Sequence, residues 1–517
     1  MTRTEMYRRL HAHTGAWDMI VVGGGATGVG VAIDAAARGY DVLLLERHDF
    51  GKGTSSRSTK LVHGGVRYLE QGNVSLVMEA LKERGLLLRN APHLVRNLGF
   101  VVPNYDWWEA PFYGIGLKLY NLLAGKYGFG ASRILSREET LERLPTIKPE
   151  GLRGGVIYFD GQFDDARLLI NLAATAFEQG ATLLNYAPVA ELTKDADGFV
   201  DGVRFRDLET GEEFEARAKV VINATGPFAD ALRRQADPTV QPMIAPSQGV
   251  HLVFDRSFLA GESAIMVPHT SDGRVMFAIP WHGHTVVGTT DTPLNEPSLE
   301  PAALDQEIEF ILQTSALYLS RTPTRADILS VFAGIRPLVK SGEGGSTAAL
   351  SRDHTIRIEN SGMITICGGK WTTYRHMAED CVNHAATLAR LADRPCVTEH
   401  LNVHGFHPSP EKFGPLWMYG SDAPLIGQLP ESGEALDGEL PYTAAEVLWA
   451  VREEMARSVE DVLARRTRAL FLNASAALRM APRVAHLMAV ELHRDEAWEA
   501  EQLAEFRRTA ANYVVQH

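Results

Sequence analysis

Residues 18–46 read DMIVVGGGATGVGVAIDAAARGYDVLLLE and carry the strongest structural signal in the chain. An apolar strand at 19–22 runs into a glycine-rich turn, an alanine-rich helix follows, and a second apolar strand lies at 42–45. Such a β-α-β unit binds a dinucleotide, because its glycines allow a sharp turn, the approach of a pyrophosphate to the backbone and close packing of helix on strand. The helix N-terminus adds N–H groups and a positive dipole end. We therefore predict a dinucleotide site at Gly23, Gly25 and Gly28.

The residues that follow this unit extend the predicted cofactor site. Glu46 lies 18 residues after Gly28, at the end of the second strand, where a carboxylate can accept hydrogen bonds from ribose hydroxyls. The next polar stretch offers small hydroxyl side chains that can line a phosphate or ribityl chain. These residues alone leave a flavin and a nicotinamide cofactor open. The predicted hydroxyl contacts are Thr54, Ser55 and Ser56.

The composition excludes several classes of protein. The chain has 517 residues, with 51 lysines and arginines against 64 aspartates and glutamates, and a formal net charge of −13. An acidic chain lacks the basic face that nucleic acids require, so no nucleic-acid partner is expected. Its three cysteines match no disulfide framework, which favours a reducing compartment. No signal peptide is recognisable and no apolar run reaches ~20 residues, so we expect a protein that is soluble or sits on a membrane surface.

The rest of the chain predicts a mixed α/β fold with three domains. Residues 165–235 resemble the second half of a dinucleotide-binding fold, and residues 250–295 alternate short strands with turns, as in an antiparallel sheet. Capping-box starts and apolar stripes beyond residue 405 predict a helical domain. We expect a discontinuous Rossmann-like domain at 17–94, 160–236 and 345–395, a mostly antiparallel-sheet substrate domain at 95–159 and 237–344, and a C-terminal helical domain at 405–517.

Two further glycine-rich turns are expected to lie against the cofactor. Gly226 follows an apolar strand, and Gly368 with Gly369 comes just before a predicted helix. Glycine lets the backbone approach a ligand closely, and the N–H groups at the start of a helix face anions. By contrast, the paired histidines His282 and His284 have no third ligand nearby, so no metal site is predicted.

An aromatic stretch at 107–129 has two interpretations. Its tryptophan, tyrosine and phenylalanine side chains are interleaved with leucines, and Lys118 and Lys126 flank the apolar part. An amphipathic aromatic segment can dock on a membrane interface, but a buried core helix produces the same pattern. The residues alone leave both interpretations open.

Taken in order, the motifs resemble those of the FAD-dependent glycerol-3-phosphate dehydrogenases, which belong to the glycine-oxidase and D-amino-acid-oxidase-like flavoproteins. The matching stretches span nearly the whole chain, and their combination is far more specific than any one of them. They are GGGATG at 23–28, TSSRSTKLVHGGVRYLE at 54–70, FDDARL at 163–168, NATGP at 223–227, IPWHGHTVVGTTD at 279–291, GIRPL at 334–338, SRDHTI at 351–356 and GGKWTTYR at 368–375.

The resemblance implies an FAD enzyme that oxidises sn-glycerol 3-phosphate to dihydroxyacetone phosphate. Hydride passes to FAD, and electrons pass on to a membrane quinone, ubiquinone or menaquinone. It implies a cytoplasmic protein held peripherally at the inner face of the cell membrane, and it leaves a homodimer open. The alternatives are a glycerol-3-phosphate oxidase that reduces oxygen to hydrogen peroxide, an amine or amino-acid oxidase of the same superfamily, and a flavin-containing structural or sensor protein.

The resemblance and the chemistry of the substrate together define the expected substrate site. A phosphate dianion needs fixed positive charge, which arginine supplies best. Removal of the C2 hydroxyl proton needs a base near neutral pH, for which His63 and His251 are the candidates. A cation such as Arg336 can instead hold the alkoxide electrostatically. The predicted substrate contacts are Arg67, Tyr68, Arg336, Arg352, Lys370 and Thr373, with Lys370 also assigned to the cofactor and Arg375 left out because it follows on the next helix.

Overall fold

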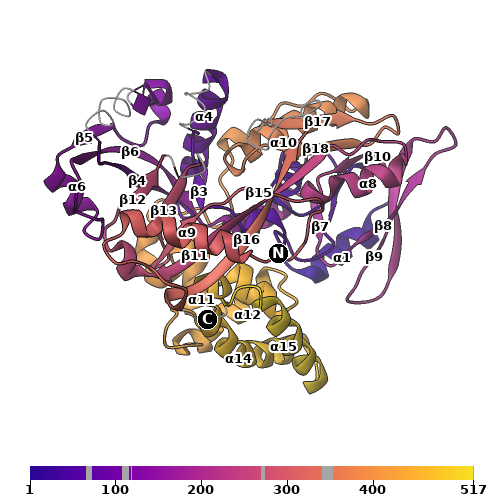
Figure 1. Cartoon of the computed structure of the whole chain (residues 1–517). Coiled ribbons are helices and arrows are strands. Elements are labelled where there is room, and N and C mark those ends of the chain that lie inside the picture. Colours follow the sequence, from indigo (N-terminus) through magenta and orange to yellow (C-terminus); the bar gives the residue numbers. More distant parts are fainter. Residues whose placement is uncertain are drawn as a thin grey trace.

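The computed structural model describes residues 1–65, 73–106, 116–117, 119–120, 122–268, 270, 274–340 and 353–515 (Figure 1). The predicted strands at 19–22 and 42–45 are confirmed as β1 (Trp17–Val22) and β2 (Val42–Leu45), with α2 (Ala26–Ala37) between them. β1 pairs in parallel with β2 on one side and with β10 (Glu213–Asn223) on the other. The β-α-β unit therefore lies at the centre of its sheet.

The first sheet has eight described strands in the order β17-β18-β10-β1-β2-β7, with β8 and β9 extending β10 as an antiparallel hairpin. β1, β10 and β18 run parallel, so their carboxyl ends meet at one edge of the sheet. Ligands of open α/β sheets bind at this edge. The remaining bounds are β7 (Thr182–Leu184), β8 (Val189–Lys194), β9 (Val200–Arg206), β17 (His354–Ile358) and β18 (Ile364–Gly368).

The second sheet has ten described strands and is mostly antiparallel, as the sequence predicted. Its path runs β15-β11-β14-β13-β12-β4-β6-β3, with β16 paired to β11 and β5 paired to β6. β16, the partner of β11 in the longest pair, contacts β18 and the turn at Gly226 of the first sheet. The bounds are β3 (Leu61–Val62), β4 (Val95–Asn104), β5 (Arg133–Leu135), β6 (Gly154–Phe163), β11 (Ile244–Asp255), β12 (Ala264–Val267), β13 (Met276–Trp281), β14 (His284–Gly288), β15 (Thr292–Pro293) and β16 (Ile328–Val339).

Helices pack around both sheets, and the C-terminal helices form a separate layer below them in Figure 1. No helix in the described part of the chain is long and apolar enough to cross a membrane. The helices are α1 (Arg3–Ala12), α4 (Val74–Asn90), α6 (Arg137–Arg143), α7 (Asp165–Glu178), α8 (Ala229–Ala236), α9 (Asp305–Tyr318), α10 (Tyr374–Leu388), α11 (Ala423–Gly427), α12 (Ala444–Glu453), α13 (Ala469–Leu472), α14 (Ala474–Leu492) and α15 (Glu496–Ala510).

Buried ion pairs join the C-terminal helical layer to the first sheet. Arg465 and Arg466 both contact Asp49, which follows β2, through nitrogen–oxygen distances of 2.5 Å. All three side chains are almost fully buried. A buried charge is tolerated only when its partner and hydrogen bonds compensate for lost hydration, so this junction demands a defined geometry.

Candidate active site

The glycines of the first β-α-β unit have different structural roles. Gly23 has φ +115°, and a Cβ there would lie 2.5 Å from the carbonyl oxygen of Ala224. A Cβ at Gly28 would overlap the carbonyl oxygen of Gly23. Gly25 is different, because it is the N-cap of α2 and a Cβ there would meet only the Ser55 hydroxyl at 3.1 Å. Gly23 and Gly28 are thus required by packing, whereas Gly25 keeps the helix N-terminus open to a ligand.

The α2 N-terminus fits the diphosphate of a dinucleotide. Its first turn holds no acidic side chain, and the N–H of Ala26 donates to the Ser55 hydroxyl at 2.9 Å. The Glu46 carboxylate at the end of β2 accepts from the N–H groups of Gly24 (2.6 Å) and His48 (2.8 Å). Burial raises the pKa of Glu46. A positive helix end beside an acidic residue at the ribose position is what an adenine dinucleotide requires, so these residues fit FAD.

The hydroxyl-rich segment connects the two sheets. The Thr54 hydroxyl donates to the carbonyl of Ile335 on β16 at 2.6 Å. The Ser55 carbonyl accepts from the indole N–H of Trp371 at 2.9 Å, while the Ser56 side chain is buried. The Ser56 hydroxyl donates to the Gly53 carbonyl at 3.5 Å, so all three predicted hydroxyls already hold protein partners that fix the shape of the site.

A cavity of about 240 Å³ lies where this segment, β11, β16 and the turn after β18 meet. Arg57 and Thr59 line it from the hydroxyl-rich segment, and Gly249 and Phe277 line it from the second sheet. None of these four was predicted, although Arg57 and Thr59 lie within a recognised motif. The cavity also brings together predicted residues that are far apart in sequence, namely His63, His251, Arg336, Gly368, Gly369 and Lys370.

His251 forms part of the cavity wall and is only 2% exposed. Its ring stacks on Phe332 at 4.8 Å, and its Nε2 lies 3.0 Å from the Thr59 hydroxyl. Its Nδ1 is buried and has no hydrogen-bond partner among the described residues. Burial, together with the nearby cations Lys60 and Arg336, holds the pKa of His251 well below its usual value. The imidazole is therefore neutral at physiological pH.

Arg336 is oriented by residues of β11 and the β14–β15 connection. Its guanidinium contacts Asp291 at 3.2 Å and donates to the Thr290 carbonyl at 3.0 Å. A Cβ at Gly249 would lie 2.5 Å from its Nη2, so the guanidinium lies across the backbone of β11. Asp291 also accepts from the Ser247 hydroxyl. Asp291 was not singled out from the sequence, although it ends the recognised IPWHGHTVVGTTD motif.

The other predicted residues fall into three groups. Thr373 is buried with its hydroxyl 3.3 Å from the Lys370 carbonyl, and its neighbour Thr372 lines the cavity instead. Gly226 begins a short turn after β10 that packs against β16 and β18, and it does not itself line the cavity. The predicted residues that lie outside the described part of the chain are Arg67, Tyr68 and Arg352.

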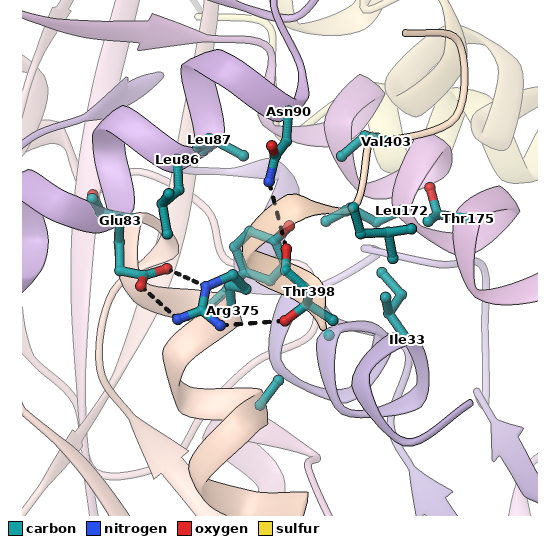
Figure 2. Close-up of a pocket in the computed structure, with 15 residues that line it drawn as sticks. Ile33, Glu83, Leu86, Leu87, Asn90, Leu172, Thr175, Arg375, Thr398 and Val403 are labelled. Atoms are coloured by element: carbon teal, nitrogen blue, oxygen red, sulfur yellow. Dashed lines mark hydrogen bonds and ion pairs between the residues drawn. The ribbon is translucent and has the colours of Figure 1, made fainter. Parts of the chain in front are cut away.

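Arg375 faces away from this cavity, as its place on the next helix predicted. Figure 2 shows it in a smaller cavity of about 30 Å³, held by both oxygens of Glu83 at 2.7 and 2.8 Å and by the Thr398 hydroxyl at 3.2 Å. Because Glu83 belongs to α4 and Arg375 to α10, this buried pair joins two helices. Thr372 lines both cavities, so the pair supports one wall of the larger one.

The described residues contain no group of three or more histidine, cysteine, aspartate or glutamate side chains placed to hold a metal ion. His282 instead lies 2.8 Å from Asp164, through its Nε2. The paired histidines therefore take part in packing between β13, β14 and α7.

Comparisons with known proteins agree with this architecture. Residues 18–375 match the FAD dependent oxidoreductase family, and residues 396–499 match the C-terminal domain of alpha-glycerophosphate oxidase. The mitochondrial glycerol-3-phosphate dehydrogenase of Arabidopsis thaliana is 42% identical over 94% of this chain and 84% of its own length. The human mitochondrial enzyme is 41% identical over 96% of this chain and 73% of its own.

Solved structures of known proteins share this architecture. Glycerol-3-phosphate dehydrogenase from Bacillus halodurans, complexed with FAD, has a TM-score of 0.79 and 30% identity, covering 99% of this chain and 98% of that one. The L-alpha-glycerophosphate oxidase of Mycoplasma pneumoniae, at 18% identity and a TM-score of 0.57, shares the fold.

A parallel dinucleotide-binding sheet joined to an antiparallel sheet that walls a cavity is the architecture of an FAD-dependent oxidoreductase. Within that class, the chain belongs to the glycerol-3-phosphate dehydrogenases. The family, the fold class and the FAD cofactor predicted from the sequence motifs are therefore confirmed.

Proposed function

We propose that this protein oxidises sn-glycerol 3-phosphate to dihydroxyacetone phosphate. The observation that carries the proposal is the single cavity in which Arg336, Lys370 and two histidines lie beside the Gly368–Gly369 turn. Fixed cations suit a phosphate dianion, and the neighbouring glycine backbone suits a flat cofactor ring. The relatives that match this chain over most of its length are named for the same substrate.

The proposed roles follow from the positions of the side chains. Bound FAD would supply the hydride acceptor. Gly25 and the α2 N-terminus would hold its diphosphate, and Glu46 would hold its ribose. Arg336, whose guanidinium is held in place by Asp291, would bind the substrate phosphate. Arg67, Tyr68, Arg352 and Lys370 remain proposed substrate contacts, and Thr372 takes the place of Thr373 because it is the threonine that lines the cavity.

We assign the proton-accepting role to His63. Catalytic bases work best with a pKa near the operating pH, and the pKa of His251 is held well below its usual value. His63 lines the cavity, and its backbone N–H is fixed by the Thr372 hydroxyl at 3.1 Å. His251 is the second candidate, and stabilisation of an alkoxide by the Arg336 guanidinium is the third route.

Anaerobic mixing of the FAD-loaded protein with glycerol 3-phosphate tests the substrate. We expect the flavin absorbance near 450 nm (a general property of oxidised flavins) to bleach within seconds, since enzymes of this kind turn over at about 1–10³ per second. Glycerol and an amino acid such as glycine serve as controls and are expected to leave the spectrum unchanged over the same interval. Bleaching by glycine in place of glycerol 3-phosphate would favour the amino-acid oxidase alternative.

We further propose that the electrons pass to a quinone at the inner face of the cell membrane. The described part of the aromatic stretch is amphipathic, because Leu117 and Tyr120 are buried whereas Leu119 is 46% and Leu122 is 77% exposed. Exposed leucines on a helical surface suit an interface with lipid. Residues 107–115, which include the tryptophan pair, lie outside the described residues.

The double substitution Leu119→Glu with Leu122→Glu tests this surface. Because both side chains are exposed, we expect the variant to fold, to keep FAD and to reduce a soluble dye at the wild-type rate. Its binding to anionic liposomes and its quinone reductase activity are expected to fall together by about tenfold or more. Each leucine that becomes buried in the lipid is expected to contribute about 1.5–3 kcal/mol to membrane binding.

The matched control introduces the same charges at exposed apolar positions elsewhere, Leu317→Glu with Val490→Glu. This control is expected to keep liposome binding and quinone reduction. Normal liposome binding by the Leu119 and Leu122 variant would exclude this surface. Rapid reoxidation of the reduced wild type by oxygen, with release of hydrogen peroxide, would instead favour the oxidase alternative.

A further inference from the structure

Lys60 is a fully buried cation behind the cavity wall. It lies between Ser56 and β3 with a left-handed backbone, φ +65°. Its ammonium lies 2.7 Å from the Asp165 carboxylate on α7 and 2.8 Å from the Ser56 carbonyl. The side chains of Lys60 and Asp165 are both 0% exposed. Burying such a pair is costly unless further hydrogen bonds compensate for the lost hydration.

Asp165 ties the cavity wall to the C-terminal helices. It accepts from the backbone N–H and the hydroxyl of Ser58, at 2.9 and 2.7 Å. It also accepts from Arg468 at 3.0 Å, and Arg468 donates in addition to the Ser56 carbonyl at 2.9 Å. Lys60 and Arg468 therefore share the same two acceptors. The segment from Ser56 to Lys60, which includes Ser58 and Thr59 of the cavity wall, is held from both sides.

The same cation lies close to His251. The Lys60 ammonium sits 4.9 Å from the centre of the Phe332 ring, on which His251 stacks. Thr59, the residue before Lys60, contacts His251 Nε2 at 3.0 Å. A protonated His251 carries an N–H on both ring nitrogens, and the described residues offer no acceptor to the one at Nδ1. Geometry and charge thus both favour the neutral ring.

The charged groups that face Lys60 and His251 influence the pKa of each side chain. Asp164, Asp165 and Arg468 act on Lys60, and burial lowers the pKa of Lys60 to about 7. Lys60 and Arg336 act on His251, and both lower its pKa. At the acidic pH that protonation of His251 requires, Lys60 carries its charge. Removal of that charge is therefore expected to make His251 easier to protonate.

We propose that Lys60 is a positioning residue for the oxidation of glycerol 3-phosphate, which fixes the Ser58–Thr59 wall and whose positive charge, next to the Phe332 ring on which His251 stacks, adds to burial in keeping His251 neutral. This inference rests on the proposed function. Lys60 is not among the residues that line the cavity, and it acts through His251 and Thr59. The active form of the cavity is the one with His251 unprotonated and hydrogen-bonded to Thr59.

The test compares wild-type holoenzyme with Lys60→Gln, which keeps an amide donor near Ser56 and Asp165 but removes the charge. Asp165 retains Arg468 and Ser58 as partners, so the variant is expected to fold and load FAD. The anaerobic rate of flavin reduction by limiting glycerol 3-phosphate is measured from pH 5 to 9. A second measurement is the calorimetric Kd of dihydroxyacetone phosphate over the same range.

In the wild type we expect an acid limb in both measurements. The phosphate group of each ligand, whose second pKa is about 6, contributes to this limb in every variant, so the contribution of His251 is the part that is missing from His251→Gln. In Lys60→Gln the limb should move about one pH unit upward, the size of shift that one nearby charge produces. The matched control Lys52→Gln removes a cation that pairs with Glu460 of the C-terminal layer, and its limb should stay at the wild-type pH.

An unshifted limb in Lys60→Gln would overturn the inference even if the melting temperature fell, because a merely structural lysine would produce that result. An acid limb of His251→Gln that coincides with the wild-type limb would overturn it as well. If Lys60→Gln does not load FAD, Lys60→Met, which also removes the charge and keeps an unbranched side chain, takes its place, and a limb shifted by less than about half a pH unit would then overturn the inference. A wild type that glycerol 3-phosphate does not reduce would refute the proposed function, and this inference with it.

Discussion

Replacement of Gly25 by valine is expected to give a folded protein without FAD. The backbone at Gly25 is extended, with φ −81° and ψ 179°, a conformation that valine adopts readily. A Cβ there meets only the Ser55 hydroxyl at 3.1 Å, so the fold can accommodate it. The branched side chain would, however, occupy the space at the α2 N-terminus that the diphosphate needs. Purified Gly25→Val protein should lack the flavin absorbance and all glycerol-3-phosphate dehydrogenase activity.

Two companion variants separate loss of the cofactor from loss of the fold. Gly28→Ala should misfold, because its Cβ would overlap the Gly23 carbonyl oxygen. Ala37→Val, at the far end of the same helix, should keep both FAD and activity. The apo form of Gly25→Val should melt within about 3 °C of the wild-type apo form, as expected for a loss of at most about 1 kcal/mol. A Gly25→Val protein that retains its full flavin spectrum would contradict the assigned diphosphate site.

Arg336→Ala is expected to raise the apparent KM for glycerol 3-phosphate by about ten- to a hundredfold or more, because a charge-assisted hydrogen bond contributes about 1.5–3 kcal/mol. The substitution also uncovers Asp291, whose carboxylate now pairs with Arg336 and would then repel the phosphate dianion. The slow oxidation of uncharged glycerol, measured at high concentration, should be nearly unaffected. Steady-state kinetics with a soluble dye provide the measurement.

The double variant Arg336→Ala with Asp291→Asn separates the two effects. It removes the cation without leaving an uncovered carboxylate, so its KM should lie between those of the wild type and Arg336→Ala. Arg336→Lys keeps the charge without the planar fork and should lose less than either. Equal losses on glycerol 3-phosphate and glycerol would show that Arg336 does not bind the phosphate.

The positions of many residues in the proposed cofactor site could be predicted, because these residues are neighbours in sequence. Gly23, Gly25, Gly28 and Glu46 occur within one β-α-β unit, and local strand and helix patterns determine where each of them lies. The motif order also sufficed to recognise the family. Thr373, in contrast, could not be separated from Thr372 by sequence, since which of the two hydroxyls lines the cavity depends on how the turn after β18 packs.

Long-range packing alone produced the rest of the site. The pairing of Arg336 with Asp291 depends on the β11–β16 register, which brings Gly249 opposite Gly334 and leaves room for the guanidinium. The Lys60, Asp165 and Arg468 cluster joins residues more than 400 positions apart at its extremes. Local patterns carry no information about such contacts, because a buried charge is stabilised only by the partners that the complete fold brings to it. The class of cofactor and the family could thus be predicted from the sequence. The charge state of His251 and the orientation of the Arg336 guanidinium, in contrast, are consequences of tertiary structure.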